Sequence, residues 1–217
     1  MRVRAEEVSK IIGPTTLLAP VSLTVESGQC AVVRGVNGSG KTTLLRILAG
    51  LTEPTTGTAT ISAGTEPGES VAERNPVTRA AVAALLGAPT AYRDLTLADH
   101  LTLIDASWGR DSHTCEERVD RGLDLLRIGH LAARFPHELS SGQGQLFRLA
   151  ITLFRPGRLL ILDEPEQRLD TEKRALLADL ITERSTGGTT VIMASHDPAL
   201  TAAVADQVID LLPAENE

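Results

Sequence analysis

One stretch of sequence decides the fold: Gly35-Val36-Asn37-Gly38-Ser39-Gly40-Lys41-Thr42-Thr43. Two glycines separated by four residues, then a lysine and a hydroxyl residue, form the phosphate-loop pattern. The apolar run 30–33 before it predicts a short buried strand. The residues after it place Leu44, Leu45, Ile47 and Leu48 on one side of a helix that ends at Gly50. The sequence therefore predicts the strand, loop and helix that this pattern requires.

The residue types in the loop suit a nucleotide. Its glycines permit backbone angles and a close approach that side chains would prevent, so successive amide groups can surround a phosphate at the positive end of the helix. Lys41 is expected to reach the β- and γ-phosphates, and Thr42 to bind Mg²⁺ through its hydroxyl. All nine residues are expected to contact the nucleotide: Gly35, Val36, Asn37, Gly38, Ser39, Gly40, Lys41, Thr42 and Thr43.

Length and composition favour one soluble domain. The 217 residues, 42% of them hydrophobic, suffice for a sizeable core. A net charge of −7 and the absence of a Lys/Arg run argue against nucleic-acid binding. No apolar run approaches the roughly 18 residues of a membrane span, and no signal peptide is evident, so we expect a cytoplasmic protein. Cys30 and Cys115 are expected to be reduced thiols.

Strands and helices alternate along most of the chain. Residues 2–25 predict an antiparallel edge, residues 58–61 a further strand, residues 64–76 an exposed loop and residues 80–86 a buried strand. Helices are expected from a capping box at Thr96 and from about Thr114. The predicted fold is an α/β core of residues 1–86 and 156–217 with an antiparallel β edge. Residues 87–155 are expected to form an inserted helical subdomain.

A second group of polar residues opens at Leu139-Ser140-Ser141-Gly142-Gln143. Apolar residues at helical spacing follow it, so this stretch lies at a helix N-terminus, which is a position that can bind an anion. A plain helix cap is the alternative interpretation of the same residues.

Acidic residues and a histidine follow two predicted strands. Residues 159–162 form an apolar strand that ends at Asp163 and Glu164, where ligands bind in open α/β sheets. Asp163 suits Mg²⁺ binding and Glu164 suits general-base chemistry. Asp170 is expected to cap the next helix. His196 follows the strand 190–194 and is a candidate sensor of the γ-phosphate.

These motifs, in this order and at roughly this spacing, resemble those of the ATP-binding-cassette ATPases over nearly the whole chain. The resemblance implies a P-loop NTPase (RecA-like) core with Gly35–Thr43 as Walker A, Leu159–Glu164 as Walker B and Leu139–Gln143 as the signature motif. Asp170 matches the D-loop acid and His196 the switch histidine. The resemblance also implies that Lys41, Glu164 and His196 take part in catalysis, and that the protein binds ATP and Mg²⁺.

The resemblance further implies a head-to-tail pair of cassettes, which can be two identical copies or two related subunits. Each ATP then lies between the glycine loop of one subunit and the signature of the other. Ser140, Gly142 and Gln143 would contact the nucleotide bound to the partner, and Asp170, as the D-loop acid, is also expected to contact a nucleotide.

Three positions depart from the family pattern. Ile12 stands where an aromatic residue usually stacks on adenine, and it is expected to bind the base by apolar contact instead, so we expect weak discrimination between ATP and GTP. The residues Gly87-Ala88-Pro89-Thr90 contain no glutamine where the family has one, so we expect slower or less tightly coupled hydrolysis. Ser141 replaces a signature glycine.

The expected function is the energising subunit of a transporter whose membrane-spanning subunit is a separate chain, placed peripherally on the inner face of the cell membrane. Because the chain ends soon after residues 207–211, a small exporter is favoured. Two alternatives stay open: a soluble cassette ATPase in assembly, translation or repair, and a nucleotide-gated binding module with little turnover.

Overall fold

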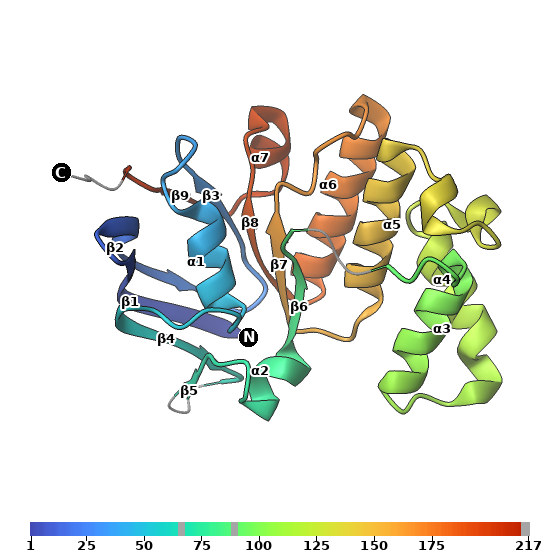
Figure 1. The fold of residues 1–217 in the computed structure, drawn as a ribbon, viewed down its shortest axis with the longest axis horizontal. Coiled ribbons are helices and arrows are strands. Elements are labelled where there is room, and N and C mark those ends of the chain that lie inside the picture. The colour runs from blue at the N-terminus through green and yellow to red at the C-terminus, as the bar shows by residue number, and fades with distance from the viewer. Residues whose placement is uncertain (65–67, 88–90, 214–217) are drawn as a thin grey trace.

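The computed structural model describes residues 1–64, 68–87 and 91–213, and it contains two sheets and a group of helices (Figure 1). The parallel sheet has the strand order β6-β7-β8-β3-β9, and the antiparallel sheet has the order β2-β1-β4-β5. The strands are β1 (Arg2–Ile12), β2 (Thr15–Val25), β3 (Cys30–Arg34), β4 (Thr56–Ser62), β5 (Glu69–Ser70), β6 (Val82–Leu85), β7 (Leu159–Asp163), β8 (Thr190–Ala194) and β9 (Gln207–Asp210). The longer helices are α1 (Lys41–Leu48), α2 (Pro76–Ala81), α3 (Leu97–Ser107), α4 (Cys115–Asp124), α5 (Ser141–Phe154), α6 (Thr171–Thr186) and α7 (Pro198–Val204).

The central strands are apolar because both faces of the parallel sheet are covered. In β3, Ala31 and Val33 belong to the cluster formed with α1 and the antiparallel sheet. Cys30 and Val32 belong to the cluster formed with α5 and α6 on the other face. The alternation of strand side chains thus joins two hydrophobic cores through one sheet. This arrangement places the carboxyl ends of β3, β7 and β8 at a common edge.

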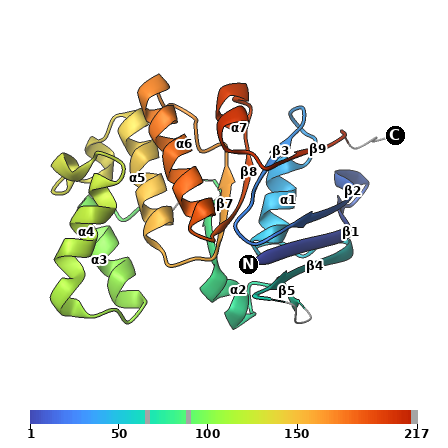
Figure 2. The same ribbon diagram turned by 180° about the vertical axis from the view of Figure 1, so that it is seen from behind.

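Helices α3, α4 and α5 lie on the side of the molecule away from the β1–β2 hairpin (Figures 1 and 2). The predicted caps are present: Thr96 and Asp99 form a capping box at α3, and Ser140 and Gln143 form one at α5. Leu101, Leu123 and Leu149 from the three helices are fully buried in one cluster, which continues into the core beneath α6. The expected α/β core with an antiparallel edge and a helical insertion is confirmed.

Two local predictions were wrong. The apolar run 80–86 is not one strand, because Asn75 caps α2 and Pro76 starts it, so Ala80 and Ala81 are helical and only β6 is extended. The stretch 64–76 is more than an exposed loop: it contains β5, which pairs with β4, and Val71 is buried. Among the described residues, no helix has both the length and the hydropathy that a membrane crossing requires. Cys30 and Cys115 are free thiols, as predicted.

Candidate functional site

The glycine loop leads directly from β3 into α1. Gly40 occupies the N-cap of α1 with φ +92°, and a Cβ there would lie 2.6 Å from the carbonyl oxygen of Leu17, so both its angle and its surroundings require glycine. Gly38 has φ +85° and faces open space. Gly38 and Gly40 both line the cavity next to the loop. The loop is therefore shaped as a cradle for a group the size of a phosphate.

The polar atoms of the loop suit an anion. The Lys41 ammonium donates to the carbonyl oxygens of Gly35 and Val36 at 2.8 and 3.1 Å, so its charge lies over the loop. The hydroxyl of Ser39 is buried and has no hydrogen-bond partner among the described residues. The Ser39 side chain lies beside Gly35 and does not line the cavity next to the loop, so Lys41 is the side chain that suits the anion here.

Two candidate metal ligands lie side by side. The Thr42 hydroxyl donates to Asp163 Oδ2 at 2.7 Å, and Asp163 Oδ1 is buried without a hydrogen-bond partner in the described part of the chain. In residues 1–64, 68–87 and 91–213, no cluster of three or more His, Cys, Asp or Glu could hold a metal ion. Mg²⁺ often binds through one or two protein oxygens and substrate phosphates, so this pair of ligands fits it.

Glu164 lies at the centre of the site. It lines three adjoining cavities of about 370, 230 and 400 Å³, one next to the glycine loop, one next to Thr42 and Asp163, and one next to His196. Its Oε1 lies 3.3 Å from His196 Nε2, and the Gln167 amide donates to its Oε2. Both carboxylate oxygens are therefore held, which fixes the orientation of the group.

Glu166 is a residue that the sequence analysis missed. It is 6% exposed, and its Oε1 accepts hydrogen bonds from the Ser195 hydroxyl at 2.5 Å and from the His196 N–H at 3.1 Å. Its Oε2 is buried and has no partner among the described residues. Glu166 thus ties the turn after β7 to the segment that carries His196. The sequence feature that could have indicated Glu166 is that it is a further acidic residue, two positions after Glu164.

The signature helix contributes a second set of contacts that the sequence did not reveal. Gln145 is buried and donates from Nε2 to the Pro165 carbonyl at 2.9 Å. Arg148 donates to the carbonyl of Gly87, at the end of β6. Both side chains line the cavity that contains Thr42, Asp163 and Glu164. Ala88, where a glutamine was expected from the family pattern, lies outside the described residues.

The signature residues do not join the glycine loop within one chain. Ser140 Oγ accepts from the Gln143 N–H at 3.3 Å, and Gln143 Oε1 accepts from the Ser140 N–H at 2.9 Å, so both side chains cap α5. Ser140, Gly142 and Gln143 are absent from the lining of the three cavities around Glu164. Asp170 caps α6 and pairs with Lys173 at 2.6 Å.

Ile12 is 60% exposed at the tip of the β1–β2 hairpin, and it does not line the cavity next to the glycine loop. Thr15, Thr16 and Leu17 of the same hairpin line that cavity. The part of the hairpin that faces the glycine loop is therefore residues 15–17, and the sequence did not indicate these residues.

Comparison with known proteins gives consistent results. The model of the ABC transporter family matches residues 18–167. A sulfate/thiosulfate import ATP-binding protein of Vibrio cholerae is 33% identical, with 96% of this chain and 55% of that protein covered. A Nod factor export ATP-binding protein of Cupriavidus pinatubonensis is 32% identical, with 88% and 57% covered. The chain thus spans little more than half the length of these relatives.

Solved structures show the same fold. The ATP-binding subunit of an ABC transporter superposes with a TM-score of 0.85 at 25% identity, covering 97% of this chain and 86% of that chain. A dimeric ATP-binding cassette in a post-hydrolysis state with ADP and Pi gives a TM-score of 0.86 at 22% identity, covering 99% and 96%. The expected P-loop NTPase fold is confirmed.

Proposed function

The chain belongs to the ABC transporter family as one of its ATPase cassettes, and from this premise we propose that it drives a transporter whose membrane-spanning subunit is a separate protein. One observation carries the proposal. The glycine loop, Asp163, Glu164 and His196 converge at one edge of the sheet, while the signature residues of the same chain lie outside their cavities. Such a site is half of a composite site, and a second cassette would complete it.

Each converging residue has a role in this proposal. The loop amides and Lys41 bind the phosphates, and Thr42 and Asp163 bind Mg²⁺, which offsets negative charge on the phosphates when present. Glu164 accepts a proton from the attacking water. His196 lies 3.3 Å from Glu164, and from there it would contact the γ-phosphate.

The second cassette would supply Ser140, Gly142 and Gln143 in trans. These residues begin α5, whose N-terminal amides and positive dipole end favour an anion. ATP bound between two such surfaces would hold the pair together, and hydrolysis would release it. The membrane subunit would convert this motion into transport, and the cassette would then lie on the cytoplasmic face of the membrane.

The direction of transport stays a prediction. Most relatives of similar identity are named as import proteins and one as an export protein, so relatedness does not support the expected exporter. The soluble ATPase and the low-turnover binding module remain as alternative functions, and the experiment below distinguishes them.

Copurification tests the proposal. We expect the tagged full chain, solubilised from host membranes in mild detergent, to bring with it a protein with several hydrophobic helices in a fixed ratio. Hydrolysis without such a partner would instead support the soluble ATPase. Absence of both the partner and steady-state hydrolysis would support the binding module.

A further inference from the structure

A cavity far from the nucleotide site is lined by arginines. It has a volume of about 380 Å³ and lies where α4 meets the C-terminal ends of α5 and α6. Its polar side chains all carry guanidinium groups, and the rest of its wall is mainly apolar: Arg110, Arg118, Arg121, Arg155 and Arg184, with Gly122, Leu125, Leu126, Leu153, Phe154 and Pro156. α5 begins at the signature motif, so at 1.5 Å per residue the cavity lies about 20 Å from it.

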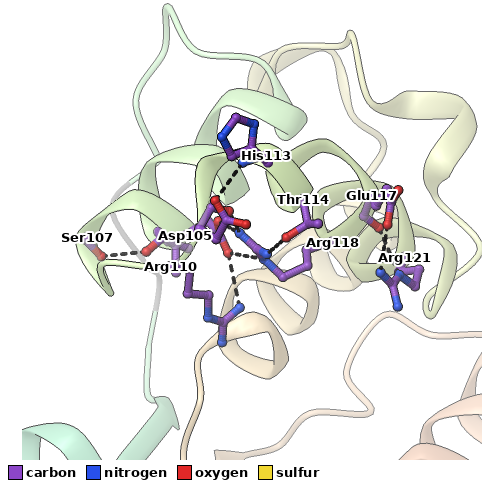
Figure 3. Close-up of polar contacts among 10 residues, drawn as sticks. Asp105, Ser107, Arg110, His113, Thr114, Glu117, Arg118 and Arg121 are labelled. Carbon is purple, nitrogen blue, oxygen red and sulfur yellow. Dashed lines mark hydrogen bonds and ion pairs between the residues drawn. The ribbon is translucent and has the colours of Figure 1, made fainter.

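Two of the arginines form hydrogen bonds with a buried carboxylate of the protein. Asp105 is 1% exposed and accepts hydrogen bonds from Arg118 and from Arg110, the latter at 3.2 Å (Figure 3). Arg118 also donates to Thr114 and to a backbone carbonyl, so most of its donors are occupied. The hydrogen bond from Arg118 is the main reason that the pKa of Asp105 falls to about 2. This carboxylate stays charged and balances only part of the cluster.

The other three arginines have weak carboxylate partners or none among the described residues. Arg121 pairs with the exposed Glu117 at 3.4 Å. Arg155 and Arg184 have no carboxylate partner among the described residues. Arg155 lies 5.9 Å from the Trp108 ring, and burial lowers its pKa. Arg184 donates to the Leu153 carbonyl at 2.9 Å.

A structural explanation accounts for part of this arrangement. Arg155 and Arg184 lie at helix C-termini, where cations interact favourably with the dipole. However, a guanidinium has five N–H donors, and Arg184 uses one of them in a direct bond. Positive charge is thus concentrated in one cavity of a chain whose net charge is −7. Holding several cations together without matching anions is costly, and a bound anion would offset that cost.

We propose that this cavity binds an amphipathic anion, in which a phosphate or carboxylate group is joined to a short apolar body. The anionic group contacts Arg155 and Arg184. A guanidinium can donate two parallel hydrogen bonds to two oxygens of a carboxylate or of a phosphate. The apolar body lies against Leu125, Phe154 and Pro156, which line the cavity. The volume is within the range of small-molecule sites. Either a free small molecule or the head group of an anionic lipid has this chemistry.

Calorimetry with hexyl phosphate as the probe tests the site, using the full chain with its nucleotide site saturated by Mg-ADP. We expect hexyl phosphate to bind with a Kd below about 1 mM. Inorganic phosphate should bind at least tenfold more weakly, and hexanol should not bind, because each lacks one of the two required features. Arg155→Gln combined with Arg184→Gln should weaken hexyl phosphate binding at least tenfold.

Matched variants separate the site from effects on folding. Arg127→Gln removes an exposed arginine outside the cavity and should leave binding unchanged. Leu125→Trp fills the cavity from a position that is 40% exposed, and it should abolish binding while the cooperative unfolding transition persists.

Flotation distinguishes the two sources of the anion. Binding to phosphatidylglycerol vesicles that requires Arg155 and Arg184, and is absent with phosphatidylcholine vesicles, supports a lipid head group. Hexyl phosphate binding without such flotation supports a free small molecule. If hexyl phosphate does not bind at 10 mM, or binds equally well to the folded double variant and to Leu125→Trp, the proposal is wrong.

Discussion

Replacement of Glu166 by alanine removes the link between the two segments that carry Glu164 and His196. In the protein, Glu166 Oε1 accepts from the Ser195 hydroxyl at 2.5 Å and from the His196 N–H at 3.1 Å. A hydrogen bond to a charged group contributes about 1.5–3 kcal/mol. If that free energy keeps His196 next to Glu164, its loss lowers kcat for ATP hydrolysis by about 10- to 150-fold.

The assay is steady-state ATP hydrolysis with kcat and KM measured separately. We expect Glu166→Ala to lower kcat and to change KM for ATP by less than about twofold, because Glu166 does not line the cavity next to the glycine loop. Glu166→Gln keeps a side-chain acceptor for Ser195 and His196, so it should retain most of the activity. Glu183→Gln is the matched control, since this exposed acid of α6 lies away from all three cavities around Glu164.

A double-mutant cycle decides whether Glu166 acts through His196. If it does, Glu166→Ala should have little further effect on kcat in a His196→Ala background. Effects of the two substitutions that multiply, or an unchanged kcat in Glu166→Ala, would refute the reasoning. A merely structural role would instead lower the unfolding temperature and affect both backgrounds equally.

Three further predictions concern other positions. ATP and GTP should compete with affinities within tenfold, because Ile12 replaces the usual aromatic residue; a larger preference for ATP in competition binding would contradict this. Ala88→Gln should raise ATP hydrolysis or its coupling to transport, and unchanged rates for both would contradict the importance of the missing glutamine. Asp105→Asn should lower the free energy of unfolding by about 2 kcal/mol at pH 7, because it removes a carboxylate paired with Arg118. Since the pKa of Asp105 is lowered to about 2, its stabilisation is full above about pH 4 and is lost towards pH 2, so denaturation curves of the two proteins should converge there.

Features set by local sequence could be predicted. The glycine loop, the apolar strands and the caps at Thr96, Ser140 and Asp170 each depend on residues close together in the chain. The run 80–86 was assigned wrongly because a continuous apolar stretch has no period that separates a buried helix end from a strand. The Pro76 and Asn75 signal just before it was the better guide.

Features that depend on distant residues could not be predicted. Glu166 acquires its role from Ser195 and His196, about 30 positions later, and although it stands out as a further acid after Glu164, the nearby sequence does not identify these partners. The arginine cavity draws on α4, α5 and α6, which are separated along the chain and meet only in the folded protein. The position of Ile12 relative to the loop likewise depends on how the β1–β2 hairpin packs against α1.

The most direct test of a composite, hydrolysing site is to compare the wild-type chain with Glu164→Gln in Mg-ATP, measuring phosphate release and mass in solution together. We expect the wild-type chain to release phosphate, whereas Glu164→Gln should release at least 100-fold less and accumulate as a pair of cassettes. That pair should be lost when Ser140 is also replaced by arginine. Phosphate release by Glu164→Gln at the wild-type rate would show that Glu164 is not the general base, and a pair that persists after Ser140 is replaced by arginine would show that the signature does not complete the site.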